Sequence, residues 1–135
     1  MNDVLVNKLS TISRCLVRIK VVYNEAGSNF TTDYTRQDSV ILNLQRVCEA
    51  SIDIANHLNK QNGLGIPQSS RDSFQLLFTA GLLSESIASS MKKMIGLRNI
   101  AVHDYQQLNI AIVQSVVTKH LIDFEQFMEE IKHRL

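Results

Sequence analysis

Apolar residues recur through most of the chain at intervals of three and four, which is the spacing of one face of an α-helix. The first run covers residues 3–23, and the second begins near Thr35 or Gln37 and reaches Lys60. Their apolar positions are Leu5, Leu9, Ile12, Leu16, Ile19 and Tyr23, then Val40, Ile41, Leu44, Val47, Cys48, Ile52, Ala55 and Leu58. The pattern predicts two long amphipathic helices, joined by a loop over the turn-forming residues 24–33.

Three more helices are predicted beyond residues 61–67, whose sequence QNGLGIP is typical of a helix end. A capping box formed by Ser69 with Asp72, or by Asp72 with Gln75, predicts a short helix through residues 74–78. Ser84 is the expected N-cap of a fourth helix. A fifth helix is expected from about residue 109 to residue 132, with an apolar face of Val113, Val117, Leu121, Phe124, Met128 and Ile131.

These elements predict an all-α fold, an up-and-down helical bundle of four long helices and one short helix, in a single domain over residues 1–135. The chain has only five glycines and one proline, too few for the turns of a β-sandwich or barrel. Cys15 and Cys48 fall in apolar stretches without the spacing of a zinc or redox site, which predicts reduced core residues. With no leader peptide and no apolar run of roughly 18 residues, we expect a cytoplasmic protein that does not enter a membrane.

The net charge of +1 argues against a protein that coats nucleic acid by bulk electrostatics, so any contact with RNA must be local. Lys92, Lys93 and Arg98 lie close together in the sequence with no acidic residue before Asp104. This cluster is compatible with a local basic cleft.

The fourth helix carries the residues that suggest chemistry. Its apolar stripe consists of Ile87, Met91, Met94, Ile95 and Val102, and Arg98 falls in the middle of that stripe. Because burying an unpartnered guanidinium is costly, Arg98 must reach a carboxylate, a cleft or a second subunit. If the helix runs unbroken, one half of it carries Arg98, Asn99, His103 and Tyr105.

An arginine, an asparagine, a histidine and a tyrosine together suit chemistry on a phosphodiester. A histidine such as His103 can take or return a proton, and Arg98 offers a planar fork to the charge that grows on phosphorus. No metal or other cofactor is needed for this chemistry. Spacing alone leaves a structural interpretation open, in which His103 caps the helix, Arg98 forms an ion pair and Tyr105 is a packing anchor.

A single histidine cannot act as base and acid on opposite sides of one phosphorus at the same time. Two copies of the chain related by a two-fold axis would supply two His103 and two Arg98 side chains. The sequence therefore favours a composite site in a homodimer.

Residues 98–105, which read RNIAVHDY, resemble the active-site motif of HEPN ribonucleases: Arg, four residues, His, one residue, Tyr, with Asn after the Arg. Four more stretches look like the HepT family, and the likeness covers most of the chain. They are residues 38–46 (DSVILNLQR), 53–58 (DIANHL), 63–71 (GLGIPQSSR) and 94–97 (MIGL).

The resemblance implies an endoribonuclease toxin that works without metal, with two motifs lining a shared cleft of the dimer. Arg98 would bind and stabilise the phosphate, His103 would act as general acid or base, and Asn99 would orient one of them. The partner would be a minimal nucleotidyltransferase, the MntA-type antitoxin, in a larger hetero-oligomer. It would silence the toxin by transferring AMP from ATP to the hydroxyl of Tyr105, because the adenylate puts charge and bulk where an RNA phosphate should lie.

Two alternatives from other classes remain open at this point. The first is a non-catalytic HEPN module that binds nucleotide or serves as a regulatory subunit of a nucleotidyltransferase. The second is a purely structural helical-bundle interaction protein, for which a change at Arg98 would chiefly affect stability or association.

Overall fold

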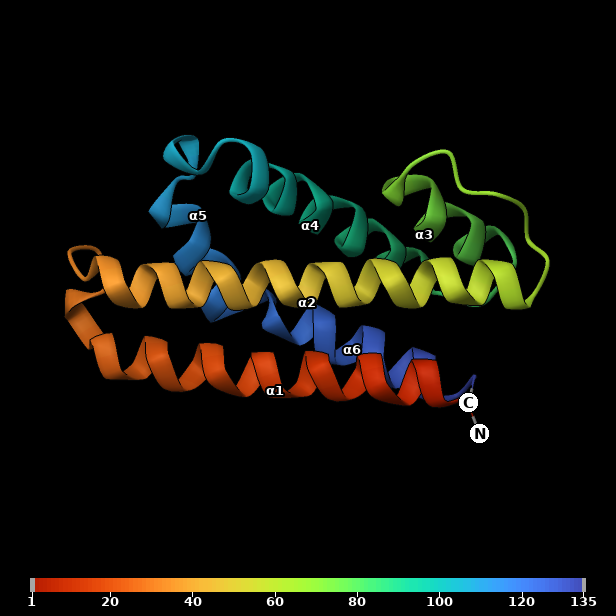
Figure 1. Ribbon diagram of the computed structural model, residues 1–135, viewed down its shortest axis with the longest axis horizontal. Coiled ribbons are helices and arrows are strands. Elements are labelled where there is room, and N and C mark those ends of the chain that lie inside the picture. Colours follow the sequence, from red (N-terminus) through yellow and green to blue (C-terminus); the bar gives the residue numbers. More distant parts are fainter. Residues whose placement is uncertain (1, 135) are drawn as a thin grey trace.

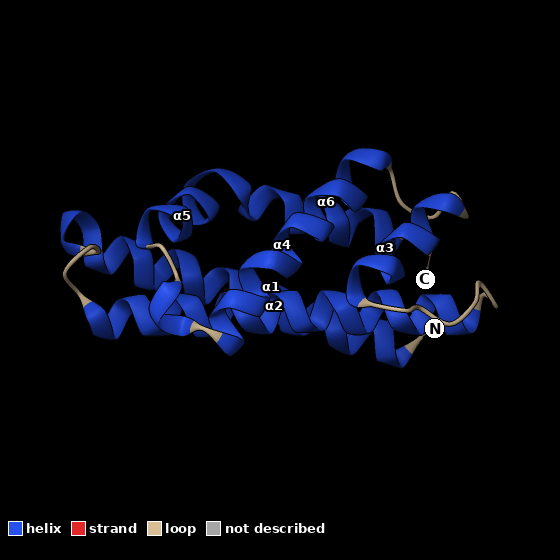
Figure 2. Cartoon of the chain, turned by 90° about the horizontal axis from the view of Figure 1, so that it is seen from above, coloured by secondary structure: helices blue, strands red, loops and turns tan. Residues whose placement is uncertain are grey.

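Four rods of helix run alternately up and down the long axis of the molecule (Figure 1). The computed structural model describes residues 2–134, and within this range it contains only helices, turns and loops (Figure 2). The α-helices are α1 (Asp3–Ala26), α2 (Tyr34–Gln61), α3 (Ser70–Thr79), α4 (Glu85–His103), α5 (Ile110–Ser115) and α6 (Leu121–Lys132). Two short 3₁₀ helices, η1 (Gly27–Asn29) and η2 (Tyr105–Gln107), and one π-helical turn, η3 (Val116–His120), complete the order.

The bundle closes around one core. Helix α1 packs against α2 and α6, and α4 packs against α2 and α6 from the other side, with α3 in the corner between α2 and α4. The largest fully buried side chains include Phe30, Phe74, Phe124 and Phe127. The predicted all-α, up-and-down bundle of four long helices and one short helix is confirmed when α5, η3 and α6 are taken as one rod.

The helix starts follow the predicted capping chemistry. The Ser69 hydroxyl accepts a hydrogen bond from the Asp72 amide at 3.0 Å, and the Ser84 hydroxyl accepts one from the Ile87 amide at 3.3 Å. Each bond satisfies a backbone donor that the first turn of a helix leaves without a partner. The predicted starts of α3 and α4 are therefore confirmed.

The connection between α1 and α2 is shorter than the predicted loop over residues 24–33. Helix α1 continues to Ala26, whose methyl group is buried, and it ends at Gly27, where φ is +56°. That positive φ is open to glycine at little cost, so Gly27 ends the helix where Tyr23 was expected to do so.

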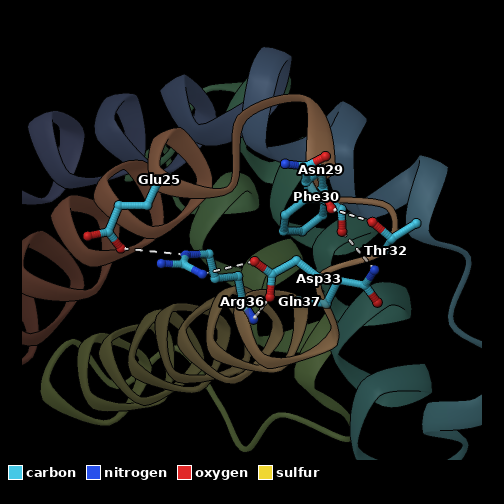
Figure 3. Close-up of polar contacts among 7 residues, drawn as sticks. All are labelled: Glu25, Asn29, Phe30, Thr32, Asp33, Arg36 and Gln37. Atoms are coloured by element: carbon cyan, nitrogen blue, oxygen red, sulfur yellow. Dashed lines mark hydrogen bonds and ion pairs between the residues drawn. The ribbon is translucent and has the colours of Figure 1, made fainter.

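Polar contacts hold this corner together (Figure 3). Arg36 Nη1 lies 2.9 Å from Asp33 Oδ2, and Arg36 Nε lies 3.8 Å from Glu25 Oε1 on α1. The Gln37 amide donates to the Phe30 carbonyl at 2.8 Å, and the Phe30 side chain is fully buried. The corner thus fixes the N-terminal end of α2.

The predicted fifth helix is interrupted by the π-helical turn η3. The buried positions of this rod step from Val113 to Val116, and then by five residues to Leu121. A regular α-helix repeats its buried side every three or four residues, so the extra residue is absorbed by the wider turn. Val117, expected on the buried face, packs against the core but is only partly buried, and Val116 is the buried residue of this turn.

Helices α2 and α3 are joined by a buried amide. Asn59 is fully buried, and its Nδ2 donates to the Ser73 carbonyl and to the Ser73 hydroxyl, each at 2.9 Å. Cys15 and Cys48 are free and buried, as predicted. Among residues 2–134, none of the helices has the length and apolar character needed to cross a membrane.

Candidate functional site

Helix α4 ends at His103, two residues before Tyr105. Asp104 leaves the helical conformation with φ −151° and ψ 59°, although its amide still donates to the Ile100 carbonyl at 2.9 Å. The next three residues form η2, which turns the chain toward α2. The expectation of an unbroken helix through Tyr105 is therefore wrong, and Tyr105 does not lie on the stripe that contains Arg98.

Arg98 reaches a carboxylate, as its place in the apolar stripe required. Its Nη2 lies 3.3 Å from Glu49 Oε1 on α2, and its Nη1 donates to Asn99 Oδ1 at 3.2 Å. The side chain is 27% exposed, so part of the guanidinium faces solvent. Its Nε is buried without a hydrogen-bond partner within residues 2–134. The fork retains free N–H groups that an anion can bind.

Asn99 is hydrogen-bonded to Arg98 and lies one helical turn before His103. Its Oδ1 accepts the hydrogen bond from Arg98, and His103 follows it by one helical turn on the same side of α4. His103 is exposed in the last turn, and its ring makes no hydrogen bond or ion pair to any residue from 2 to 134. An exposed imidazole can exchange protons with a bound substrate.

Val102, which was expected in the buried stripe of α4, is 39% exposed. The rest of the stripe, Ile87, Met91, Met94 and Ile95, is buried as predicted. The last turn of α4 therefore stands out from the core and presents the motif to solvent.

Tyr105 contacts the first turns of α2. Its hydroxyl donates a hydrogen bond to Asp38 Oδ1. Partial burial of the phenol, together with the hydrogen bond to Asp38 and the negative charge of that carboxylate, raises the pKa of Tyr105 to about 12. The residue is still 46% exposed, so a reagent can reach the ring and its hydroxyl.

The arginine end and the tyrosine end of the motif contact separate points on α2. Asp38 and Glu49 are 11 residues apart, which is about 16 Å along a helix, and three turns bring them to the same face. Gln45 lies between them and donates to Glu49 Oε1 at 3.2 Å. In one chain, therefore, Arg98 and Asn99 are brought together, whereas Tyr105 is held further along α2.

A groove of about 570 Å³ lies beside the motif, between α4 and the rod formed by α5 and η3. Its walls are mainly apolar and include Met94, Leu97, Ile100 and Ile112, of which Ile100 and Ile112 are 41% and 52% exposed. Lys93 lines the same groove and adds a positive charge. The surface next to the motif thus exposes large apolar side chains.

The buried Cys48 lies close to Arg98 but is not a nucleophile. Both residues line a small pocket between α2 and α4. Burial raises the pKa of the Cys48 thiol to about 12, against the opposing effect of the Arg98 charge. The thiol is therefore neutral and belongs to the core.

Sequence reasoning assigned no role to Asp38, Gln45 or Glu49. Asp38 lies 67 residues from Tyr105, and Glu49 lies 49 residues from Arg98, so no local spacing joins either pair. The available signal was on α2 itself, where Asp38 and Glu49 share a face at an interval of three turns.

Comparison with known proteins places the chain in a family. Residues 12–131 match the family model described as ribonuclease HepT-like. The mRNA nuclease HepT of Shewanella oneidensis is 62% identical over 132 residues, which cover 98% of each protein. Two solved structures have the same fold at 60–61% identity. The first is a tri-AMPylated HEPN toxin of Shewanella oneidensis in complex with MNT antitoxin, with a TM-score of 0.94 and coverage of 98% of this chain and 99% of that one.

The second is a toxin–antitoxin structure with AMP-PNP, with 60% identity, a TM-score of 0.92 and coverage of 97% of this chain and 99% of that one. Both the family match and the near-complete relative include the whole of α4, η2 and the facing part of α2. The protein therefore belongs to the HepT-like ribonuclease family.

Proposed function

We propose that this chain, as one HepT-like domain over residues 1–135, is the toxin of a toxin–antitoxin pair and cleaves mRNA in the cytoplasm, where that substrate is found. The observation that carries the proposal is the solvent-facing end of α4, where Arg98 is hydrogen-bonded to Asn99 and an exposed His103 follows five residues later in the same helix. The near-complete relative named mRNA nuclease HepT supports RNA as the substrate.

Cleavage would proceed by attack of the ribose 2′-oxygen on phosphorus. His103 accepts the 2′-hydroxyl proton, and the free N–H groups of Arg98 stabilise the negative charge on the phosphoryl oxygens. Asn99 holds the guanidinium in place through its Oδ1. The products are a 2′,3′-cyclic phosphate and a free 5′-hydroxyl, and no step requires a metal ion or another cofactor.

The leaving 5′-oxygen needs a proton from the opposite side of the phosphorus, which the same His103 cannot supply. A second copy of the chain, related by a two-fold axis, would bring its own His103 and Arg98 to the shared cleft. The exposed Ile100, Val102 and Ile112 beside the motif support this homodimer, because burying them would stabilise association.

The toxin would be silenced by a minimal nucleotidyltransferase antitoxin of the MntA type that transfers AMP from ATP to the Tyr105 hydroxyl. The related HEPN toxin was captured tri-AMPylated in complex with an MNT antitoxin, and a related toxin–antitoxin pair binds AMP-PNP, an analogue of ATP. Tyr105 presents a half-exposed phenol two residues after His103. An adenylate there adds negative charge that repels RNA. The two proteins would form a larger hetero-oligomer around the toxin dimer.

The test is cleavage of labelled mRNA in EDTA by the purified protein, after mass spectrometry has established that Tyr105 carries no AMP. We expect the parent to cleave and His103→Ala to lose about 100-fold or more in rate, the range that general acid–base catalysis contributes. Cyclic phosphate at the new 3′ ends would identify the 2′-oxygen as the nucleophile.

His133→Ala is the matched control, because His133 is also exposed near the end of a helix but lies at the far end of α6. It should cleave at the parent rate. If the unmodified parent leaves every tested mRNA intact, or if His103→Ala cleaves as fast as His133→Ala, the proposed nuclease mechanism is wrong and the non-catalytic HEPN module takes its place.

A further inference from the structure

The Tyr105 hydroxyl has a carboxylate as its direct hydrogen-bond partner. The donor comes from η2 and the acceptor, Asp38 Oδ1, from α2, 67 residues earlier in the chain. Asp38 makes no other side-chain hydrogen bond or ion pair within residues 2–134, and Asp33 rather than Asp38 caps the start of α2. Within residues 2–134, Asp38 therefore neither caps a helix nor forms an ion pair, and its one side-chain hydrogen bond is to the phenol.

We propose that Asp38 is the catalytic base for the modification of Tyr105, so that the toxin supplies the group that activates its own acceptor. The inference rests on the proposed transfer of AMP from ATP to this residue. As the Tyr105 oxygen forms its bond to the α-phosphorus of ATP, the bond from that phosphorus to the bridging oxygen breaks and pyrophosphate leaves. The phenolic proton passes to Asp38 along the existing hydrogen bond.

The geometry meets two requirements of a general base: the carboxylate contacts the proton, and the phosphorus has access to the phenol. The carboxylate already accepts the proton that must be removed, which is the position from which a general base acts. Protein kinases use an aspartate in the same way to accept the proton of a substrate hydroxyl. Because Tyr105 is 46% exposed and Asp38 is itself exposed, the phosphorus can approach the phenol and the captured proton can pass to water.

The chemistry of the phenol makes a base necessary. With a pKa of about 12, on the order of one Tyr105 in 100,000 is ionised at pH 7. Since burial and Asp38 both disfavour the phenolate, the pair is unsuited to a route in which the anion forms first. It is suited to a route in which the proton leaves while the new bond forms.

The variant Asp38→Asn distinguishes the two routes, because they predict opposite changes in the rate of AMP transfer. The amide keeps an oxygen that accepts the Tyr105 hydrogen bond, but it lacks basicity and negative charge. If Asp38 is the base, AMP transfer slows by about 100-fold, within the range of general base catalysis. If Tyr105 reacts as a phenolate formed beforehand, loss of the charge lowers its pKa and AMP transfer becomes faster.

The experiment is single-turnover transfer of AMP to the full-length chain from ATP labelled at the α-phosphate, with magnesium and the cognate nucleotidyltransferase. The parent, Asp38→Asn, Asp38→Glu and Tyr105→Phe are compared, and the modified residue is located by mass spectrometry. Asp38→Glu restores a carboxylate and should recover most of the lost rate. Over pH 7 to 9, the Asp38→Asn rate should rise steeply toward the parent rate, because hydroxide replaces the missing base.

Asp104→Asn is the matched control, since it removes the same charge beside Tyr105 from a residue that makes no side-chain contact with the phenol among residues 2–134. It should react at the parent rate or slightly faster. An Asp38→Asn variant that binds the nucleotidyltransferase and reacts as fast as Asp104→Asn overturns the role of Asp38 but leaves the modification of Tyr105 standing. A parent labelled as strongly as Tyr105→Phe overturns both proposals, because the AMP then lies elsewhere.

Discussion

The Arg98 guanidinium is shared between its own helix and α2. It reaches Glu49 at 3.3 Å, and Glu49 also accepts from Gln45 at 3.2 Å. An RNA phosphate would compete with that carboxylate for part of the fork, because both are anions that accept hydrogen bonds through oxygen. At the scale of single residues, the ion pair therefore orders Arg98 and also weakens its hold on substrate.

Glu49→Gln should strengthen RNA binding without harming the fold. The amide oxygen can still accept from Arg98, while the competing charge is gone. Exposed or partly exposed ion pairs contribute about 0–1 kcal/mol, so we expect KM for RNA to fall about threefold at low salt and the melting temperature to change little. Glu129→Gln, which alters an exposed pair with Lys132 on α6, is the control. A rise in KM would instead mean that the charge of Glu49 is needed to position Arg98.

At the scale of elements, the contact between α2 and α3 contains the buried amide of Asn59, next to a hydrogen bond from the Ser73 hydroxyl to Asn56 Oδ1 at 2.8 Å. Asn59→Ala removes the buried donor that reaches the carbonyl and the hydroxyl of Ser73. Losing buried hydrogen bonds of this kind costs about 1–3 kcal/mol of unfolding free energy, measured as a lower urea midpoint with an unchanged slope. Asn24→Ala, at an exposed position of α1, should leave the midpoint within about 0.5 kcal/mol of the parent. Equal midpoints for the two variants would show that the Asn59 amide does not stabilise the contact between α2 and α3.

The sequence predicted most elements because their signals are local. Ser69 and Ser84 lie directly before apolar-periodic segments, and both cap helices as expected. The end of α4 at His103 was not predictable, because no glycine or proline marks it and Asp104 stops the helix through its backbone conformation. The contact of Tyr105 with Asp38 depends on that stop and joins distant segments, so neither residue's spacing revealed it.

At the scale of the whole molecule, one chain holds the parts of the proposed site at separate points of a rigid bundle. Helix α2 spans 28 residues and carries the contacts of both Arg98 and Tyr105. The groove between α4 and α5 opens on a different part of α4, which includes Lys93, Leu97 and Ile100. A second copy seated there would complete the proton transfers that one His103 cannot perform.

Ile112→Arg should therefore abolish RNA cleavage by preventing the dimer. Ile112 lines the groove and is 52% exposed, so the substitution places a charge in the proposed interface but leaves the core of the bundle intact. We expect a monomer by sedimentation and a parent-like melting temperature. Val17→Arg changes a valine on α1 that is also more than half exposed and lies away from the groove, and this variant should remain a dimer that cleaves RNA. A dimeric, active Ile112→Arg protein would place the interface elsewhere.

The π-helical turn η3 changes the helical register between α5 and α6. One residue more than the α-helical repeat separates Val116 from Leu121, which rotates α5 by about 100° relative to α6. The orientation of α6, which packs in the core, is thereby independent of the orientation of α5, which borders the groove. Deleting one residue within 116–120 would re-aim α5 and reshape the groove beside the motif while α6 kept its register. A change of length at this turn would therefore alter the surface offered to a partner while leaving the core unchanged.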